Sequence, residues 1–442
     1  MKLSESSKLW VLMITAFIDM VGLLMVIPIL PFYVKMLGSH GGIVGQLVGT
    51  KGGGVVGVLV SSFAIAQLIT APMWGKFSDK YGRRPALLVG LSGSAIAYVV
   101  FAFALDFTGG VALAMLFLSR LVQGAGGGTV SVIQAYVADS TAPEERTKAL
   151  GWLSAATNAG VAIGPVLGSL TSAAWGTRGP GLFAAALCLM NIAFAARYLV
   201  ESRDMHDAAS QKPRTKLSVA IKQVVTHSSE PASRLIWIYA IAMGAFQGVT
   251  SMLALYLSAR FNVTAKTIGF FFTYTGVISV LTRTLILGRM VDKFGEARLS
   301  RIGSTLLAIG IMSMAFIRPL ADPARVANML GGVLPPEAVA LLPYLPLALA
   351  VALLPLGTAF TFPCVTALLS RVISSTERGL YMGVQQTFGG IARVIFPIAF
   401  GLMFDWHLEA PFLLSASLVF FTIYLGLGME TYVAPRAQPA TT

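Results

Sequence analysis

The chain has 442 residues, of which 56% are hydrophobic and only 12% are charged, and its formal net charge is +13. Soluble globular domains carry about 25% charged residues, so most of these side chains face something other than water, and lipid is the expected solvent. The positive charges lie in short clusters between long apolar runs, which argues against the basic stripe with interleaved aromatics that binds nucleic acid.

The sequence also lacks the residue patterns of common enzyme and metal sites. Cys188 and Cys364 lie inside apolar runs and none of the four histidines does, so we expect neither a disulfide framework nor a metal site. No HExxH, nucleophile elbow, Walker loop or Rossmann glycine pattern occurs in a suitable context. We therefore expect a protein that is not an enzyme and uses no cofactor.

Twelve stretches are long and apolar enough to cross a bilayer as helices, which takes about 20 residues each. The first stretch carries Asp19 and lacks a convincing cleavage site, so we interpret it as a span and not as a signal peptide. The sequence thus predicts an all-α membrane protein with 12 transmembrane helices. The spans are predicted at residues 9–31, 53–74, 86–106, 110–138, 149–172, 180–200, 233–257, 267–288, 299–318, 341–369, 380–404 and 410–429.

The charges between the spans predict the orientation. Of the 32 Lys and Arg residues, 22 lie at the termini and in the loops after even-numbered spans, and seven lie in the loops after odd-numbered spans. Because cytoplasmic loops are enriched in Lys and Arg, we expect both termini in the cytoplasm and a multi-pass protein of the cell membrane, the inner membrane if bacterial. The glycine-rich stretch 41–57 is expected to be a flexible outer loop that runs into span 2. Residues 1–200 and 233–442 are predicted domains, joined by a cytoplasmic linker at 201–232.

Two halves of the chain repeat each other. "GKFSDKYG" (75–82) follows the second span and "GRMVDKFG" (288–295) follows the eighth, while "ERTKALG" (145–151) and "ERGLYMG" (377–383) follow the fourth and the tenth. A six-span unit has therefore been duplicated, with both copies in the same orientation. Such parallel repeats suit a transporter whose site lies at the midplane between two bundles that rock against each other.

Asp19 is the only carboxylate deep inside a predicted span, and Arg120 is a base at similar depth in another. Each lies eleven residues past the start of its run, at Lys8 and Gly109, which is roughly 16 Å at 1.5 Å per residue. A charge at mid-helix costs about 2.5–3.5 kcal/mol, so two opposite charges at one depth are expected to face a shared cavity. The functional hypothesis is that Asp19 carries a transported proton and Arg120 tunes it. The alternative is a static salt bridge between spans 1 and 4.

Four motifs in order along the chain carry a family resemblance. "GKFSDKYGRR" (75–84) matches the loop signature of the major facilitator superfamily, "RLVQGAGGG" (120–128) its fourth-span signature, and "GVAIGPVLG" (160–168) the fifth-span signature of antiporters. "DMVGLLMVIPILP" (19–31) is similar to the first span of tetracycline pumps. The chain therefore resembles the 12-span drug/proton antiporters of this superfamily, most of all the tetracycline-resistance efflux branch. This resemblance implies two six-helix bundles around a central cavity.

The loop motif predicts a latch that closes the cytoplasmic face. The Asp79 carboxylate can meet the positive N-terminal end of a helix, which the resemblance assigns to span 11, and Arg83 can pair with Asp139. In the second copy "EAR" replaces "RRP", so that latch is expected to be weaker. The alternative is that the basic residues are only positive-inside anchors. The predicted latch residues are Gly75, Asp79, Gly82, Arg83, Arg84, Asp139, Gly288 and Asp292.

Span 5 carries Gly160, Gly164 and Gly168 at intervals of four, so they share one helix face, and Pro165 can kink that helix. A tight, bent helix could seal the bundle interface against leak, or the glycines could serve ordinary small-residue packing. The resemblance to antiporters favours the seal and, with it, export.

The central cavity is expected between the bundles, with Phe246 and Phe362 as apolar walls. Each polar candidate could instead serve packing. Arg283 and Arg393 are two further basic residues inside spans; we assign Arg283 a structural role, whereas Arg393 could bind backbone carbonyls or an anionic substrate. The polar cavity candidates are Gln134, Asn158, Tyr239, Gln247, Gln385 and Arg393.

The sequence therefore predicts a proton-coupled exporter of small amphiphilic compounds, with tetracycline as the named example. Tetracycline pumps typically carry an acidic residue before the Tyr of span 3, whereas Ala97 precedes Tyr98 here, so tetracycline itself stays open. Two alternatives also stay open: an uptake or facilitative carrier for a metabolite, anionic if Arg120 and Arg393 bind it, and a non-transporting receptor or scaffold. The expected partners are a small-molecule substrate, protons and the bilayer, and we expect a monomer.

Overall fold

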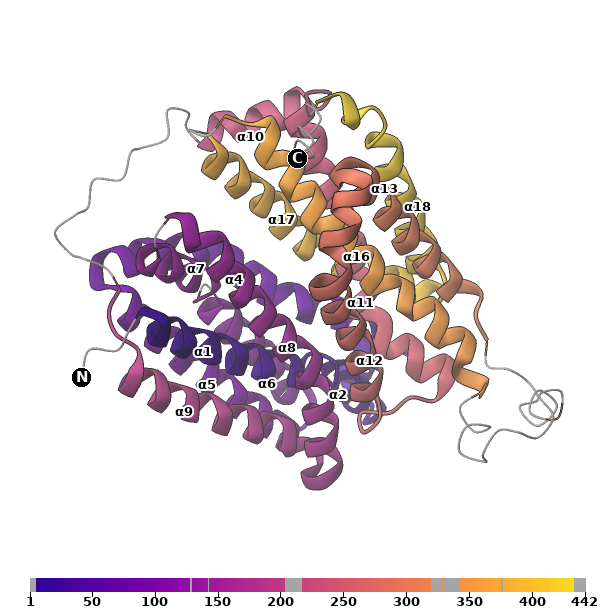
Figure 1. The fold of residues 1–442 in the computed structure, drawn as a ribbon. Helices are drawn as coiled ribbons and strands as arrows, with labels where there is room; N and C mark the ends of the chain where they lie inside the picture. Colours follow the sequence, from indigo (N-terminus) through magenta and orange to yellow (C-terminus); the bar gives the residue numbers. More distant parts are fainter. Residues whose placement is uncertain are drawn as a thin grey trace.

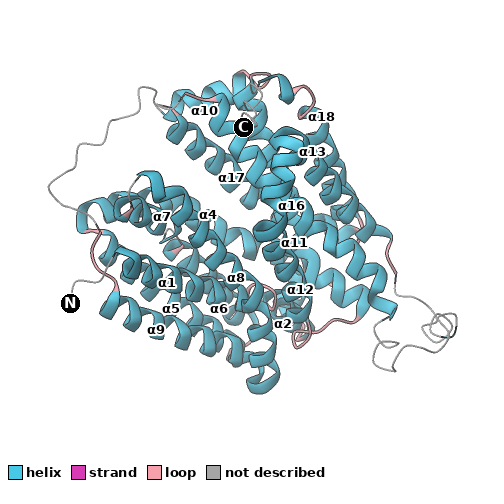
Figure 2. Cartoon of the chain, in the orientation of Figure 1, coloured by secondary structure: helices cyan, strands magenta, loops and turns pink. Residues whose placement is uncertain are grey.

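A computed structural model describes residues 5–127, 129–141, 143–202, 217–318, 328, 342–374 and 377–432. Within these residues every regular element is a helix, as Figure 2 shows. Part of the predicted linker, residues 203–216, and Gly128 of the fourth-span motif lie outside the described residues.

The helices of the first half are α1 (Glu5–Val26), α2 (Leu30–Ser39), α3 (Gly42–Val48), α4 (Gly53–Tyr81), α5 (Arg83–Phe103), α6 (Gly109–Gly126), α7 (Thr129–Ser140), α8 (Pro143–Trp175) and α9 (Gly179–Tyr198). Those that follow are α10 (Leu217–Thr226), α11 (Pro231–Phe261), α12 (Ile268–Leu281), α13 (Leu287–Phe316), α16 (Leu345–Val372), α17 (Arg378–Trp406) and α18 (Ala410–Leu425). Short 3₁₀ turns lie at Ala104–Asp106, Gly176–Arg178, Leu342–Tyr344 and Met429–Tyr432, and a π-helical turn (Thr282–Ile286) joins α12 to α13.

The twelve predicted spans are confirmed as helices. In the described part of the chain, nine helical segments are long and apolar enough to cross a membrane. Two of these segments, Ala149–Tyr198 and Ile268–Phe316, each contain two predicted spans, and Ala410–Leu425 is a shorter apolar helix in the place of the last one. Proline in the first turn starts α9, α11, α16 and α18, where its missing N–H costs no helical hydrogen bond.

The helices form two bundles that meet in a V. Figure 1 shows α1–α9 (indigo to magenta) in one bundle and α11–α18 (pink to yellow) in the other, close together near α2, α11 and α12 and apart where α7 faces α10. The bundles pack on each other mainly through two helix pairs, α4 with α17 and α8 with α12, and α11 also contacts α4 and α2. We call the end with α10 and residues 82–84 the basic end, and the opposite end, with α2, α3 and the start of α4, the far end.

The glycine-rich stretch 41–57 runs into span 2 as expected, but the expectation of a flexible loop before that span is wrong. Residues 42–48 form α3, and glycines 53, 54 and 57 lie inside the first turns of α4. Gly41, Gly49 and Gly52 have φ of 73°, 63° and 76°, the left-handed region that glycine adopts without strain. The glycines therefore make turns between short helices and open the surface of α4 to a neighbour.

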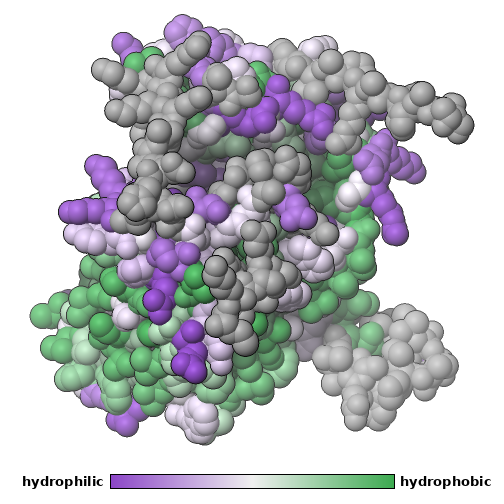
Figure 3. Space-filling model, turned by 60° about the vertical axis from the view of Figure 1, so that its left-hand side comes forward, coloured by the Kyte–Doolittle hydropathy of each residue, from purple (hydrophilic) through white to green (hydrophobic). Residues whose placement is uncertain are grey.

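The outer surface has the character expected of a protein in lipid. Figure 3 shows a broad hydrophobic (green) surface with hydrophilic residues gathered above it and along its lower edge. Large apolar side chains are widely exposed, including Ile69 at 65%, Phe316 at 69% and Leu189 at 57%. In water such a surface would drive aggregation, whereas the hydrocarbon of a bilayer covers it.

Candidate functional site

Asp19 lies in the middle of α1 and faces a small cavity inside the first bundle. The cavity measures about 30 Å³, which leaves room for at least one water molecule. Its wall mixes apolar side chains with amide and hydroxyl groups that can hydrogen-bond to a carboxyl or to water. The residues around it, from α1 and from the region of α4–α7, are Asp19, Met20, Leu23, Phe63, Gln67, Ser94, Tyr98, Gln123, Gly127 and Thr129.

Arg120 lies near this cavity but does not pair with the acid. Its side chain is buried, its Nε has no hydrogen-bond partner, and its guanidinium stacks 5.6 Å from the centroid of the Phe63 ring. Across the described residues no ion pair joins Asp19 to Arg120. Tyr98 lies within electrostatic reach of both charges. A fixed salt bridge between α1 and α6 is therefore not part of this conformation.

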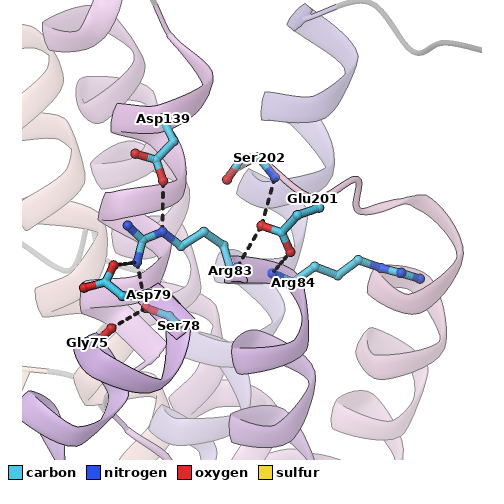
Figure 4. Close-up of polar contacts among 8 residues, drawn as sticks. All are labelled: Gly75, Ser78, Asp79, Arg83, Arg84, Asp139, Glu201 and Ser202. Atoms are coloured by element: carbon cyan, nitrogen blue, oxygen red, sulfur yellow. Dashed lines mark hydrogen bonds and ion pairs between the residues drawn. The ribbon is translucent and has the colours of Figure 1, made fainter. Parts of the chain in front are cut away.

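At the basic end, Arg83 is the centre of a polar cluster, drawn in Figure 4. Its Nη1 lies 2.9 Å from Asp79 Oδ1, and its Nε lies 2.9 Å from Asp139 Oδ2. Nη1 also donates to Ser78 Oγ at 2.7 Å, and that hydroxyl donates to the carbonyl of Gly75 at 3.0 Å. The cluster thus ties the end of α4 to the start of α5 and the end of α7, all within one bundle.

Glu201 is a residue of this cluster that the sequence did not reveal. Its two carboxylate oxygens accept hydrogen bonds from the backbone N–H groups of Arg83 and Arg84, at 2.8 and 3.0 Å. These N–H groups open α5, so the carboxylate caps the positive end of that helix. Gly82 has φ of 100°, and a Cβ there would lie 2.4 Å from Glu201 Oε2, so glycine is required for both reasons. The available signal was an acid directly after span 6.

The second repeat builds the same turn with reversed charges. Gly295, the counterpart of Gly82, also has positive φ (72°) and marks the break between the two spans inside α13. The next residue, Glu296, pairs with Arg371 at the end of α16, where the first repeat pairs Arg83 with an acid at the end of α7. Gly288 has open space around its α-carbon, as Gly75 does. Asp292 lies between the two glycines, in the place of Asp79.

Glu430 completes the correspondence between the repeats. It follows the last span, as Glu201 follows the sixth, and it pairs with Arg298 at 3.3 Å and with Arg301 at the start of the ninth span. The prediction of a weaker second latch did not include these pairs, because it compared the two motifs residue by residue and did not look for exchanged charges.

The glycines of span 5 pack against α1. A Cβ on Gly160, Gly164 or Gly168 would lie 2.7, 2.7 or 2.3 Å from a backbone carbonyl oxygen of α1. Such distances are too short for any side chain, so α8 and α1 touch backbone to backbone. This face of α8 therefore holds Asp19's helix in place and does not itself meet the other bundle.

Another face of α8 makes the contact with the other bundle. A Cβ on Gly269 of α12 would lie 2.2 Å from the carbonyl oxygen of Pro165, and Thr273 donates to the carbonyl of Ala162 at 2.9 Å. Ser169 donates to the Ala265 carbonyl and accepts from the Gly269 N–H, at 2.9 and 2.8 Å. Span 5 thus packs between α1 of its own bundle and α12 of the other bundle. A helix that closes the bundle interface against leak would need this position.

A second contact closes the far end between α4 and α17. Asp405, near the end of α17, accepts hydrogen bonds from the N–H groups of Gly53 and Gly54 at 2.7 and 2.6 Å, so a carboxylate of one bundle caps a helix of the other. Lys51 donates to the carbonyls of Phe404 and Trp406, each at 3.3 Å. Sequence analysis placed Gly53 and Gly54 at the start of a predicted span but offered no partner for Asp405, so it missed this contact.

The predicted cavity residues separate into two groups. Tyr239, Phe362 and Phe246 form an aromatic row with centroid distances of 5.6 and 6.4 Å, and Arg393 lies beside Tyr239. The others do not join this row: Gln385 is fully buried and bonded to Thr366, Asn158 bonds to its own helix at Ser154, Gln134 is exposed and Gln247 is half-buried.

Comparison with known proteins identifies the family. The sequence profile of the Major Facilitator Superfamily matches residues 12–339. The chain belongs to this superfamily. Its relatives include multidrug resistance protein 2 of Bacillus subtilis, 26% identical over 433 residues, or 97% of this chain and 95% of that protein. The class B tetracycline resistance protein of Escherichia coli is 24% identical over 431 residues, or 96% of each chain.

Solved structures agree on the fold of this superfamily member. The nucleoside transporter NupG superimposes with a TM-score of 0.66 at 14% identity, covering 96% of this chain and 99% of that one. The protein is therefore a transporter of the Major Facilitator Superfamily with the fold of two six-helix bundles, and its relatives are transporters and not enzymes.

Proposed function

We propose that the protein is a proton-coupled antiporter that exports small amphiphilic compounds, tetracycline-like drugs among the candidates, across the cytoplasmic membrane. Its relatives along nearly the whole chain are named for resistance to multiple drugs and to tetracycline. The observation that carries the proposal is the surroundings of Asp19. An acid deep in a span borders a polar cavity that can hold water, and no cation in the described residues neutralises it. Such intramembrane acids serve proton transfer in transporters.

In this mechanism the Asp19 carboxyl binds a proton from one side and releases it to the other as the bundles rock. Burial favours the neutral acid, and a nearby guanidinium favours the carboxylate. Arg120 is stacked on Phe63 in this conformation, and a movement of α4 or α6 that brings it toward Asp19 expels the proton. Tyr98, within reach of both charges, is placed to follow that change.

The two gates support alternating access. The far end is closed by the contacts of Asp405 with α4 and of α8 with α12, whereas Figure 1 shows the bundles apart at the basic end. With the Lys- and Arg-rich end in the cytoplasm, this is an inward-facing conformation. In the outward-facing state Asp79 and its neighbours meet the start of span 11 and close the basic end. In the inward-facing state Arg83 holds Asp79 within its own bundle.

The domain boundaries and the assembly follow from the same proposal. Residues 1–200 and 233–442 are the two moving bundles, residues 201–232 are the cytoplasmic linker, and one chain is the transporting unit. Its partners are the exported compound, protons and the bilayer.

The experiment is a susceptibility panel in a host that lacks its own pumps, combined with flux in everted membrane vesicles. The native protein is expected to raise the tolerated concentration of several amphiphilic drugs and to load everted vesicles with them under a proton gradient. Asp19→Asn is expected to abolish both effects at equal protein abundance. Uptake into intact cells would favour the carrier alternative, and no gradient-dependent flux of any compound would favour a receptor or scaffold.

A further inference from the structure

Arg393 of α17 is an intramembrane cation for which the proton mechanism has no use. Several arginines of the described chain that lie near helix ends pair with carboxylates, as Arg83, Arg260 and Arg371 do. Within the described residues Arg393 forms no ion pair, and its Nε is buried without a hydrogen-bond partner. A charge at this depth costs about 2.5–3.5 kcal/mol, so it needs a compensating anion at some stage.

The guanidinium of Arg393 is directed along α17 toward an aromatic surface. Both the guanidinium and the ring of Tyr239 approach Gly389. A Cβ on that glycine would lie 3.9 Å from Arg393 Nη2 and 2.7 Å from the Tyr239 ring. Gln386, one turn before, donates to the Tyr239 hydroxyl at 3.4 Å and steadies that ring. Beyond Tyr239 the aromatic row continues through Phe362. A cation therefore stands at one end of an apolar aromatic wall.

This arrangement lies where the two bundles begin to separate. Two contacts hold α4 against α17 beside Arg393. Ser61 donates to the Val394 carbonyl at 2.6 Å. The side chain of Leu68 packs on Gly390, where an added Cβ would lie 3.0 Å from the Leu68 Cδ1. Nearer the basic end, Gly383 of α17 and Gly75 of α4 both have open space around them. Arg393 thus lies between the part of α17 that packs on α4 and the part where both helices have open space around them.

We propose that Arg393 binds the carboxylate of an amphiphilic substrate whose apolar body packs on Tyr239, Phe362 and Phe246. A planar guanidinium presents paired N–H donors that match the two oxygens of a carboxylate, and an aromatic wall suits a flat apolar body. Residues Phe63 and Gln67 of the same stretch of α4 border the Asp19 cavity, so one helix separates the substrate anion from the proton site. This inference rests on the proposed function and names the substrate class of that transporter.

The test measures binding of 1-pyrenebutyrate and of its uncharged amide to the purified full-length protein in nanodiscs. The native protein is expected to bind the acid at least about tenfold more tightly than the amide. Arg393→Gln should lower the affinity for the acid and leave the affinity for the amide unchanged, so the preference is lost. Arg393→Lys should keep part of the preference. Arg283→Gln is the matched control, because Arg283 is another basic residue inside a span of the same bundle, and it should keep the full preference.

Equal affinities for acid and amide in the native protein, or binding of neither, overturn the assignment, and these measurements do not depend on any variant folding. A preference unchanged by Arg393→Gln also overturns it. Gradient-driven export of an uncharged drug by the native protein is measured in parallel. If that export persists while the acid preference is absent, the subsite is wrong and the antiporter stands; if that export is absent, the antiporter itself is wrong.

Discussion

At the residue scale, the charged side chains inside the spans differ from those near the ends of the helices in whether they form ion pairs. Several charges near the basic end form ion pairs, and some of these pairs occupy equivalent places in the two repeats. Inside the spans of the described chain, Asp19, Arg120 and Arg393 form no ion pair. Unpaired groups in a low dielectric are costly to stability, so they mark the places where function requires a charge.

The reversed polarity of the second repeat leads to a prediction about Arg83. Since Glu296 and Arg371 fill the same places with opposite charges, the double variant Arg83→Glu/Asp139→Arg should be more stable than either single variant. Each single change leaves like charges together and should lower stability by about 1–3 kcal/mol, because these groups are only partly shielded from solvent. Thermal unfolding of the four proteins in detergent gives the coupling. A double variant no better than the sum of the singles would show that the two turns are not equivalent.

At the element scale, α8 acts as a wedge between α1 and α12. Its glycines allow backbone contact on one side, and Pro165, Ala162 and Ser169 contact the other bundle. A movement of the interface therefore passes directly to the helix that carries Asp19.

One substitution at two places in α8 checks this packing. Gly164→Ala puts a methyl group 2.7 Å from the Val21 carbonyl oxygen, so α1 must shift, and overpacking of this kind costs about 1–3 kcal/mol. Gly151→Ala adds the same methyl group where nothing lies within 4 Å, and should be neutral or stabilising, since alanine favours a helix by about 1 kcal/mol. Melting temperatures in nanodiscs compare them, and equal values would refute the tight contact.

The cap at the far end predicts a shift between the two gate states. Asp405→Ala removes the carboxylate that caps α4, and loss of such a cap costs about 0.5–2 kcal/mol, or roughly a 2- to 30-fold shift toward the state open at the far end. Asp405→Asn keeps an acceptor oxygen and should shift less. Electron–electron distances between spin labels at Ile43→Cys and Lys266→Cys report this opening, because both native cysteines are buried. An unchanged distance distribution would mean that the cap does not hold the gate.

At the scale of the whole molecule, the sequence was sufficient for the fold. Apolar runs of bilayer length and the two copies of one loop motif predict twelve helices in two bundles, because lipid leaves a chain few other solutions. Contacts between segments that are distant in sequence were harder to predict. Asp405 and Glu201 act on backbone N–H groups far away in sequence, and such partners depend on packing that no local pattern encodes.

The sequence predicts which charged residues lie inside the spans, but not which groups their side chains contact. Asp19 and Arg120 stand out as charges in apolar runs, yet depth along a helix does not fix which way a side chain turns. Arg120 accordingly lies on Phe63 and not on Asp19. The predicted cavity amides were wrong for a related reason. Gln385 is fully buried, with its Oε1 bonded to Thr366 and its Nε2 without a partner, and Asn158 donates to the Ser154 carbonyl of its own helix.

The central claim is that the Asp19 carboxyl carries the coupled proton. The most direct measurement is simultaneous substrate and proton flux in proteoliposomes, with the native protein and Asp19→Asn compared at equal density. The native protein should move protons against the substrate and accumulate it under an imposed proton gradient. Asp19→Asn should still exchange substrate down its own gradient, with no proton movement and no accumulation. Accumulation by Asp19→Asn at the native rate would contradict the account.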